Sequence, residues 1–198
     1  ATYSGSFNFV VGHSWGDTLV EPHPETGEAL PNLAEAWEPS SDAKVWRFKI
    51  RQGVKFRDGS ALTTADCVAT LRRHADEKSQ SGAAGLLSSI TKIEEEGGDM
   101  VITLDAANAD LPLILTDYHL MIQPKGGAEA PAAAIGTGPY KLSEYQAGVR
   151  AAFANVDVRA TPDAAKAVET FYGDYKKFVW IDGTGVNEKA KAAIADHV

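Results

Sequence analysis

One short segment limits the fold of this chain more than any other. From Val45 to Ile50 the sequence reads Val-Trp-Arg-Phe-Lys-Ile, so that Trp46, Phe48 and Ile50 alternate with less apolar neighbours. Side chains of a β-strand point to opposite faces with a period of two, and this alternation therefore predicts a strand with one face buried. Such a strand needs further strands or a helix to cover its apolar face.

The segment that follows predicts a helix. Thr63 or Thr64 is a good N-cap residue, and Asp66 falls in the first helical turn, where a negative charge is favourable. Apolar side chains recur at helical spacing through Leu71, and basic residues gather at the end, where they suit the helix dipole. The apolar positions are Ala65, Val68, Ala69 and Leu71, and the basic ones are Arg72, Arg73 and His74.

Further elements follow from the same patterns. We expect strands at Tyr3–Val11, Met100–Leu104, Tyr140–Tyr145 and Val149–Phe153, and a short helical turn at Asn32–Trp37. The acidic, glycine-containing stretch 94–99 predicts a solvated hairpin connection, and Pro112 suits the start of a helix in the Leu-rich stretch 108–120. The Gly- and Ala-rich stretch 126–134 predicts a flexible surface loop. These elements together predict an α/β fold class.

Composition excludes some classes of partner. The 198 residues carry a formal net charge of −8 with a pI near 5.1, so we expect binding neither to nucleic acid nor to anionic membrane surfaces. The single cysteine, Cys67, lies on the apolar face of the predicted helix and is best interpreted as a small buried hydrophobe. The start, Ala1-Thr2-Tyr3, has no signal-peptide pattern. Composition alone leaves open a cytoplasmic protein or one whose leader has been removed.

The motifs of enzymes, metal sites and nucleotide sites are missing from the sequence. Gly136-Thr137-Gly138 lacks the further glycines of a dinucleotide fingerprint, and Pro139 removes a backbone donor that a phosphate cradle would use. The five histidines show no HExxH spacing and there is no CxxC, so we expect no metal and no cofactor. There is no GxSxG nucleophile motif either. We therefore expect that the chain is not an enzyme.

Three ordered segments resemble one protein family. Pro24 to Trp37 reads PETGEALPNLAEAW and is similar to the "PETGE–P–LAESW" signature of the family 5 extracellular solute-binding proteins, which serve peptide and nickel ABC importers. Trp46 to Asp66, with GVKFRDG and LTTAD, resembles that family's "GVKFHDG–LTA-D" block. Gly136 to Leu142 is similar to its "GTGPY-L" turn. The resemblance covers roughly residues 19 to 153.

The resemblance implies a fold and a function. It implies a mixed-sheet lobe like those of periplasmic binding proteins, in which residues 1–28 and 135–198 belong to the first lobe and residues 29–134 form a smaller inserted α+β domain. Family members are bilobal and much longer, so the second lobe is expected to be absent from this chain. The implied function is the substrate-binding component of an ABC importer. This component is an extracytoplasmic monomer, with its signal peptide removed, that captures a small solute or peptide in an interlobe cleft and delivers it to a membrane permease.

The same resemblance points to ligand-binding residues. The loop after the opening strand and the return from the inserted domain would face the ligand, which predicts Ser14, Trp15, Tyr118 and His119 as contacts. Both stretches also place aromatic and hydrogen-bonding groups beside apolar elements, as in small-molecule pockets. Three alternatives stay open: Trp15 and Tyr118 inside the core, a truncated scaffold or interaction protein of the same fold, and a small enzyme using His13, Ser14 or His119.

One glycine of the turn carries a separate structural prediction. Gly138 lies between Thr137 and Pro139, whose ring fixes its own φ. We expect Gly138 to adopt a backbone conformation, or to approach another segment closely, in a way that a side chain would prevent.

Overall fold

The computed structural model describes residues 12–128, 133–146, 150–155, 181–182 and 185–186. The chain divides into two compact units, Ala1–Gly138 and Pro139–Val198. This division does not test the predicted first-lobe and inserted-domain boundaries, which stay predictions. The strand predicted at Tyr3–Val11 lies outside the described residues. Among the described residues, no helix is long and apolar enough to cross a membrane.

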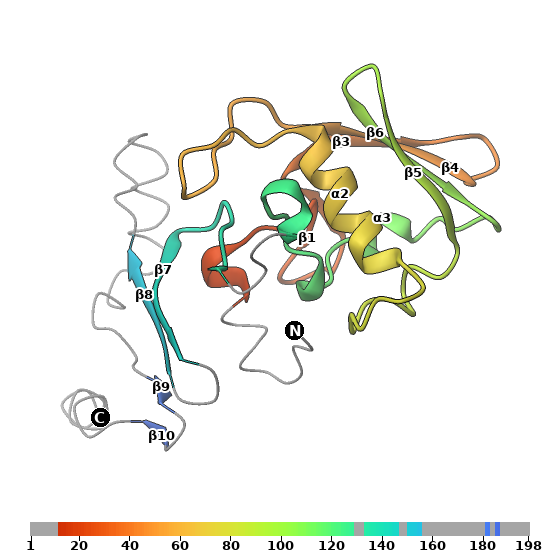
Figure 1. Cartoon of the computed structure of the whole chain (residues 1–198). Helices are drawn as coiled ribbons and strands as arrows, with labels where there is room; N and C mark the ends of the chain where they lie inside the picture. Colours follow the sequence, from red (N-terminus) through yellow and green to blue (C-terminus); the bar gives the residue numbers. More distant parts are fainter. Residues whose placement is uncertain (1–11, 129–132, 147–149, 156–180, 183–184, 187–198) are drawn as a thin grey trace. The chain divides into compact units, whose positions relative to one another are not determined.

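An antiparallel sheet forms the centre of the first unit (Figure 1). Its strand order is β3-β4-β6-β5, with β3 at Ala34–Pro39, β4 at Val45–Ile50, β5 at Ile90–Glu96 and β6 at Asp99–Leu104. The predicted strand at 45–50 is confirmed, with Trp46, Phe48 and Ile50 buried. The connection between β5 and β6 is a tight turn at Gly97 and Gly98, whose positive φ angles suit this kind of hairpin.

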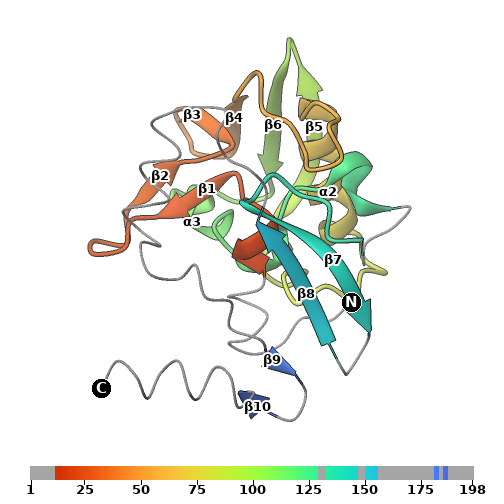
Figure 2. The same cartoon turned by 90° about the vertical axis from the view of Figure 1, so that its left-hand side faces the viewer.

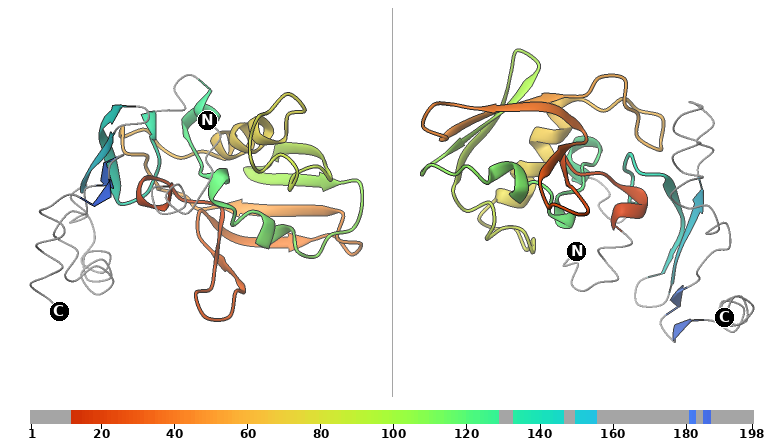
Figure 3. Two further views of the ribbon diagram at one scale, coloured as in Figure 1. Left: turned by 90° about the horizontal axis from the view of Figure 1, so that it is seen from below. Right: turned by 180° about the vertical axis from the view of Figure 1, so that it is seen from behind.

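Helix α2, Thr64–Ala75, covers one face of this sheet (Figure 3). Thr63, one of the two predicted N-cap residues, is the N-cap, and a reciprocal capping box joins it to Asp66. Cys67 and Leu71 are wholly buried in the core that α2 forms with Phe48 and Met100. Burial raises the pKa of the Cys67 thiol to about 12, so it is an unreactive, protonated core residue.

The remaining elements of the first unit are short. Strands β1, Val20–Pro22, and β2, Ala29–Pro31, form a separate hairpin (Figure 2). Helix α3, Leu111–Ile114, has Pro112 in its first turn as predicted, but it is only one turn long. The 3₁₀ turns η1, Tyr118–Leu120, and η2, Pro124–Gly127, follow it.

The second unit contains its own antiparallel sheet, in the order β10-β9-β8-β7. Strand β7 spans Tyr140–Gln146 and β8 spans Arg150–Asn155, which confirms the two strands predicted there, and they pair as an antiparallel hairpin (Figure 2). The short strands β9, Ile181–Asp182, and β10, Gly185–Val186, complete it. Every strand pair among the described residues is antiparallel.

Two local predictions are wrong. Within the expected helical turn at Asn32–Trp37, residues 34–37 belong to strand β3, because their backbone pairs with β4 and the Trp37 ring lies 6.3 Å from that of Phe48. The expected surface loop at 126–134 begins instead with two buried glycines, and its residues 129–132 lie outside the described part of the chain. A Cβ atom on Gly126 would lie only 2.7 Å from the Ala69 carbonyl carbon, so this loop packs directly against α2.

Candidate ligand-binding site

Two of the four predicted contact residues lie on a helical turn at residues 12–15, where the sequence suggested an irregular polar turn. The amide of Gly16 donates to the carbonyl of Gly12 at 3.0 Å and closes this turn. Ser14 is half-buried, whereas Trp15 is only 5% exposed. The indole of Trp15 therefore packs inside the first unit, as one of the alternative interpretations expected.

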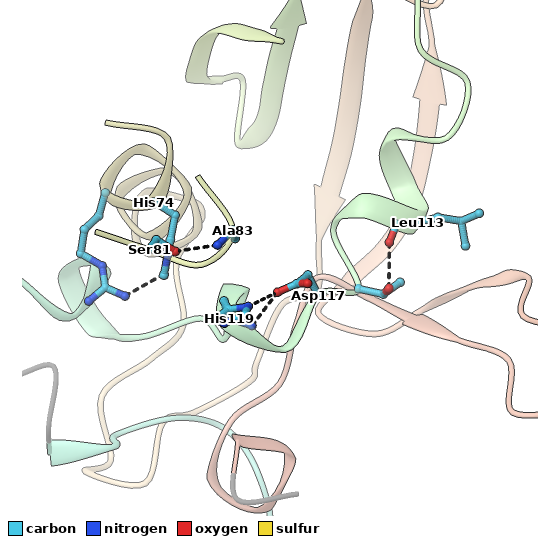
Figure 4. Close-up of polar contacts among 8 residues, drawn as sticks. His74, Ser81, Ala83, Leu113, Asp117 and His119 are labelled. Carbon is cyan, nitrogen blue, oxygen red and sulfur yellow. Dashed lines mark hydrogen bonds and ion pairs between the residues drawn. The ribbon is translucent and has the colours of Figure 1, made fainter. Parts of the chain in front are cut away.

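The other two predicted residues lie on the 3₁₀ turn η1. Asp117 caps this turn by accepting from the backbone amide of His119 at 2.9 Å and from its Nδ1 at 2.6 Å (Figure 4). The rings of Tyr118 and His119 lie 4.0 Å apart, centroid to centroid. Because a carboxylate only accepts, Nδ1 of His119 carries the hydrogen of that bond, and Asp117 fixes the orientation of the imidazole.

These two stretches are about a hundred residues apart in the sequence and adjoin in the structure. A Cβ atom on Gly12 would lie 3.7 Å from the Tyr118 carbonyl oxygen, and one on Gly16 would lie 3.1 Å from Cβ of Met121. The amide of Ile122 donates to the carbonyl of Asp17 at 3.0 Å. The structure therefore brings the two predicted stretches together, and ligand binding by their residues stays a prediction.

A third stretch, residues 136–138, completes the arrangement. The amide of Gly138 donates to the Trp15 carbonyl at 3.0 Å, and a Cβ atom on Gly138 would lie 2.6 Å from the Trp15 carbonyl carbon. Real Cβ atoms do not come this close to backbone, which confirms the predicted close approach of Gly138. Gly136 meets Trp15 in the same way. The two glycines let residues 136–138 lie directly on the helical turn.

Three further polar residues, none of them predicted as a ligand contact, belong to this arrangement: Asp17, Arg57 and Thr137. Thr137 donates its hydroxyl to the Asp17 carboxylate at 2.6 Å. Burial raises the pKa of Asp17, while the Thr137 bond and the positive charges of Arg57 and His13 oppose that rise. Burial also lowers the pKa of His13, against the attraction of Asp17. Only the fold places these groups together, because they come from distant parts of the chain.

A second buried histidine lies near His119. Arg73 donates to Nε2 of His74 at 2.9 Å, so Nδ1 carries the hydrogen and donates to the Ser81 hydroxyl at 2.6 Å (Figure 4). Burial lowers the pKa of His74 to about 4, and the charge of Arg73 adds to this. Next to Ser81, Gly82 lies so close to His119 that a Cβ atom would be 2.6 Å from Nε2. The chain at 81–83 therefore covers part of the His119 imidazole.

The 12–15 and 117–121 stretches carry several aromatic and hydrogen-bonding side chains. Within the described residues no group of three or more His, Cys, Asp or Glu side chains could hold a metal ion. The four predicted contact residues supply hydroxyl groups from Ser14 and Tyr118, an imidazole from His119 and the buried indole of Trp15.

Comparison with known proteins decides the family. The model of the bacterial extracellular solute-binding proteins, family 5 (Middle), matches residues 28–169, which is more than half of the chain. This chain belongs to that family. The resemblance noted from the sequence is thereby confirmed, and the α/β fold class with it.

Relatives of this family 5 protein include transport proteins. A probable periplasmic binding protein of a peptide ABC transporter, y4tO from Sinorhizobium fredii, is 30% identical over 191 residues, which is 89% of this chain and 34% of the relative. The dipeptide-binding protein of Escherichia coli is 30% identical over 156 residues, which is 65% of this chain and 29% of the relative. The chain thus spans about a third of the length of these relatives.

Solved structures of binding proteins share the fold of this chain. The binding protein AgaA from A. tumefaciens R10, in complex with agropinic acid, matches with a TM-score of 0.70 at 30% identity, covering 80% of this chain and 33% of that one. NikA from Brucella suis, in complex with Fe(III)-EDTA, matches with a TM-score of 0.68 at 26% identity, covering 81% of this chain and 34% of that one. The family 5 chain therefore corresponds to about one lobe of the full fold.

Proposed function

We propose that this family 5 chain belongs to the substrate-binding component of an ABC importer and captures a small, peptide-like solute. The observation that carries the proposal is the meeting of the Gly12–Asp17 and Asp117–Met121 stretches within one compact unit. Family membership supports it, because relatives are named as binding proteins for peptides and dipeptides. Such proteins bind rather than catalyse, so we propose no enzymatic activity.

Of the four predicted contacts, Ser14, Tyr118 and His119 form the proposed contact surface. The Ser14 and Tyr118 hydroxyls can donate or accept, which suits the amide and carboxylate groups of a peptide. The paired Tyr118 and His119 rings offer an aromatic face to an apolar side chain. Because Trp15 is buried, we propose that its ring supports this surface without contacting the ligand directly.

The wider context is part of the same proposal. Capture would take place in a cleft between two lobes that close by a hinge motion, with release to an ABC permease outside the cytoplasm. This chain is expected to act as a monomer. One lobe buries only part of a ligand, so the affinity of the 198-residue chain alone should be weak.

The test is a titration of the ¹⁵N-labelled chain, followed by NMR, with four probes: alanyl-alanine, glutathione, a nickel–histidine complex and agropinic acid. The proposal expects at least one probe to shift the backbone amides of Ser14, Tyr118 and His119 and the indole signal of Trp15. Tyr118→Ala should lower the affinity for that probe about tenfold, as expected for an aromatic contact residue. The control His23→Ala, in the exposed connection between β1 and β2, should leave binding unchanged.

Either of two results would count against the proposal. One is that none of the four probes shifts any signal at millimolar concentration, which would favour a scaffold or interaction role for this fold. The other is that a probe binds but shifts only residues outside the two stretches.

A further inference from the structure

Arg57 makes three successive contacts with one short segment. Its backbone amide donates to the carbonyl of Gly136 at 3.0 Å. In its side chain, Nη2 donates to the carbonyl of Thr137 at 2.9 Å and Nε donates to that of Gly138. A single residue about eighty positions away thus binds all three carbonyls of the 136–138 turn, and its side chain is half-buried there.

The opposite side of the same turn faces the helical turn at 12–15. Gly138 donates its amide to the Trp15 carbonyl, and Thr137 donates its hydroxyl to Asp17. Residues 136–138 are therefore held between Arg57 on one side and the Trp15–Asp17 stretch on the other. No side chain could replace the hydrogens of Gly136 or Gly138 here, so there is little room for the turn to shift.

Charge adds to this geometry. Burial raises the pKa of Asp17, and the positive charge of the Arg57 guanidinium limits that rise. His13 acts on the pKa of Asp17 in the same direction as Arg57. Burial raises the pKa of Glu21, and the charge of Asp17 adds to that rise. Loss of the Arg57 charge would therefore favour protonation of Asp17, and a protonated Asp17 binds less strongly to the Thr137 hydroxyl.

We propose that Arg57 is a positioning residue for ligand binding. By fixing the 136–138 turn, it holds Trp15 and Ser14 in the conformation that presents the contact surface. This inference rests on the function proposed above. Lysine cannot take this role, because an ammonium group is a point donor and lacks the planar fork that reaches two carbonyls at once. Arg57 affects ligand binding indirectly, because it acts through the 136–138 turn.

The test compares Arg57→Lys and Arg57→Met with the wild-type 198-residue chain. The first readout needs no ligand: hydrogen exchange of the Gly138 amide, measured by NMR from pH 5 to 7.5. Loss of hydrogen bonds from a charged donor should accelerate this exchange about ten- to a hundredfold in both variants. In Arg57→Met the Asp17 carboxyl should also titrate at a higher pH than in the wild type. In Arg57→Lys, which keeps a positive charge, Asp17 should titrate close to the wild-type pH.

The matched control is Arg51→Lys. Arg51 also donates its Nε to a backbone carbonyl, that of Asn32 at 2.9 Å, and it does not bind the turn. Exchange at Gly138 should be unchanged in this variant. The amides of Phe48 and Ile102 in the central sheet serve as an internal reference for folding, because a merely unfolded variant would lose protection there as well.

The second readout is binding of alanyl-alanine by the same NMR titration, with about tenfold weaker binding expected for Arg57→Lys. Unchanged Gly138 exchange in Arg57→Met, with the sheet amides intact, would overturn the positioning role. Faster exchange with unchanged alanyl-alanine affinity would overturn its link to ligand binding. If the wild type binds no alanyl-alanine, the proposed function fails for that probe, and exchange at Gly138 still decides whether Arg57 holds the turn.

Discussion

Replacing Gly138 by alanine tests the central contact of the site. The new Cβ atom would lie 2.6 Å from the Trp15 carbonyl carbon, 2.7 Å from the Gly16 nitrogen and 3.0 Å from the Ser14 carbonyl oxygen. All three atoms belong to backbone, which cannot rotate away as the end of a long side chain can. Residues 136–138 must therefore move away from the helical turn at 12–15, and the hydrogen bond from the Gly138 amide to the Trp15 carbonyl must lengthen or break.

The cost follows from these two effects. Overpacking in a tightly packed region typically costs about 1–3 kcal/mol, and a lost hydrogen bond contributes about 1 kcal/mol more. Together they lower the free energy of unfolding by about 2–4 kcal/mol. For a chain of this size each kcal/mol lowers the Tm by about 2–4 °C, so the Tm should fall by about 4–16 °C. Gly138→Val, with its larger side chain, should lower the free energy of unfolding by at least as much.

Urea unfolding, followed by the fluorescence of the four tryptophans, measures this difference directly. Gly85→Ala is the matched control, because a Cβ atom there would meet nothing within 4 Å and its φ is not positive. The control should stay within about 0.5 kcal/mol of the wild type. A Gly138→Ala variant as stable as the control would refute the reasoning from close approach.

Three further predictions concern the central sheet and helix. Thr63→Ala removes the capping box of α2 and should cost about 1 kcal/mol in urea unfolding, whereas Thr91→Ala on the exposed part of β5 should cost less. The pKa of His74 is lowered to about 4 from 6.5, so between these pH values the unfolded chain binds a proton that the folded chain does not. The unfolding free energy should therefore fall by up to about 3 kcal/mol as the pH drops from 6.5 to 4. His74→Gln should flatten that fall and His23→Gln should not. Cys67, with its raised pKa and full burial, should resist iodoacetamide at pH 8 in the folded chain and react once urea unfolds it; rapid labelling without urea would contradict its burial.

Local sequence patterns correctly predicted those elements whose conformation is set by residues close by in the sequence. The strand at 45–50 and the cap of α2 are such elements, because side-chain alternation and the Thr63–Asp66 pair act within one or two turns of chain. The hairpin at 97–98 is a third, since consecutive glycines directly permit positive φ angles. The segment resemblance to family 5 came from the sequence as well, and the family comparison confirms it.

Elements that depend on distant partners were predicted less well. Residues 34–37 have helical composition, yet they form the edge strand β3, because pairing with β4 outweighs a weak local preference. Gly126 and Gly127 look like loop residues, and only the position of α2 shows that they are needed for close packing.

The candidate site divides in the same way. The sequence by itself identified the family and predicted the two stretches that carry Ser14, Trp15, Tyr118 and His119, because the order and spacing of motifs are properties of the sequence alone. Only the tertiary structure decided that Trp15 is buried and that Arg57 binds the 136–138 turn. The physical reason is that burial and hydrogen bonding between residues eighty positions apart arise from the folded path of the chain, and no local pattern encodes them.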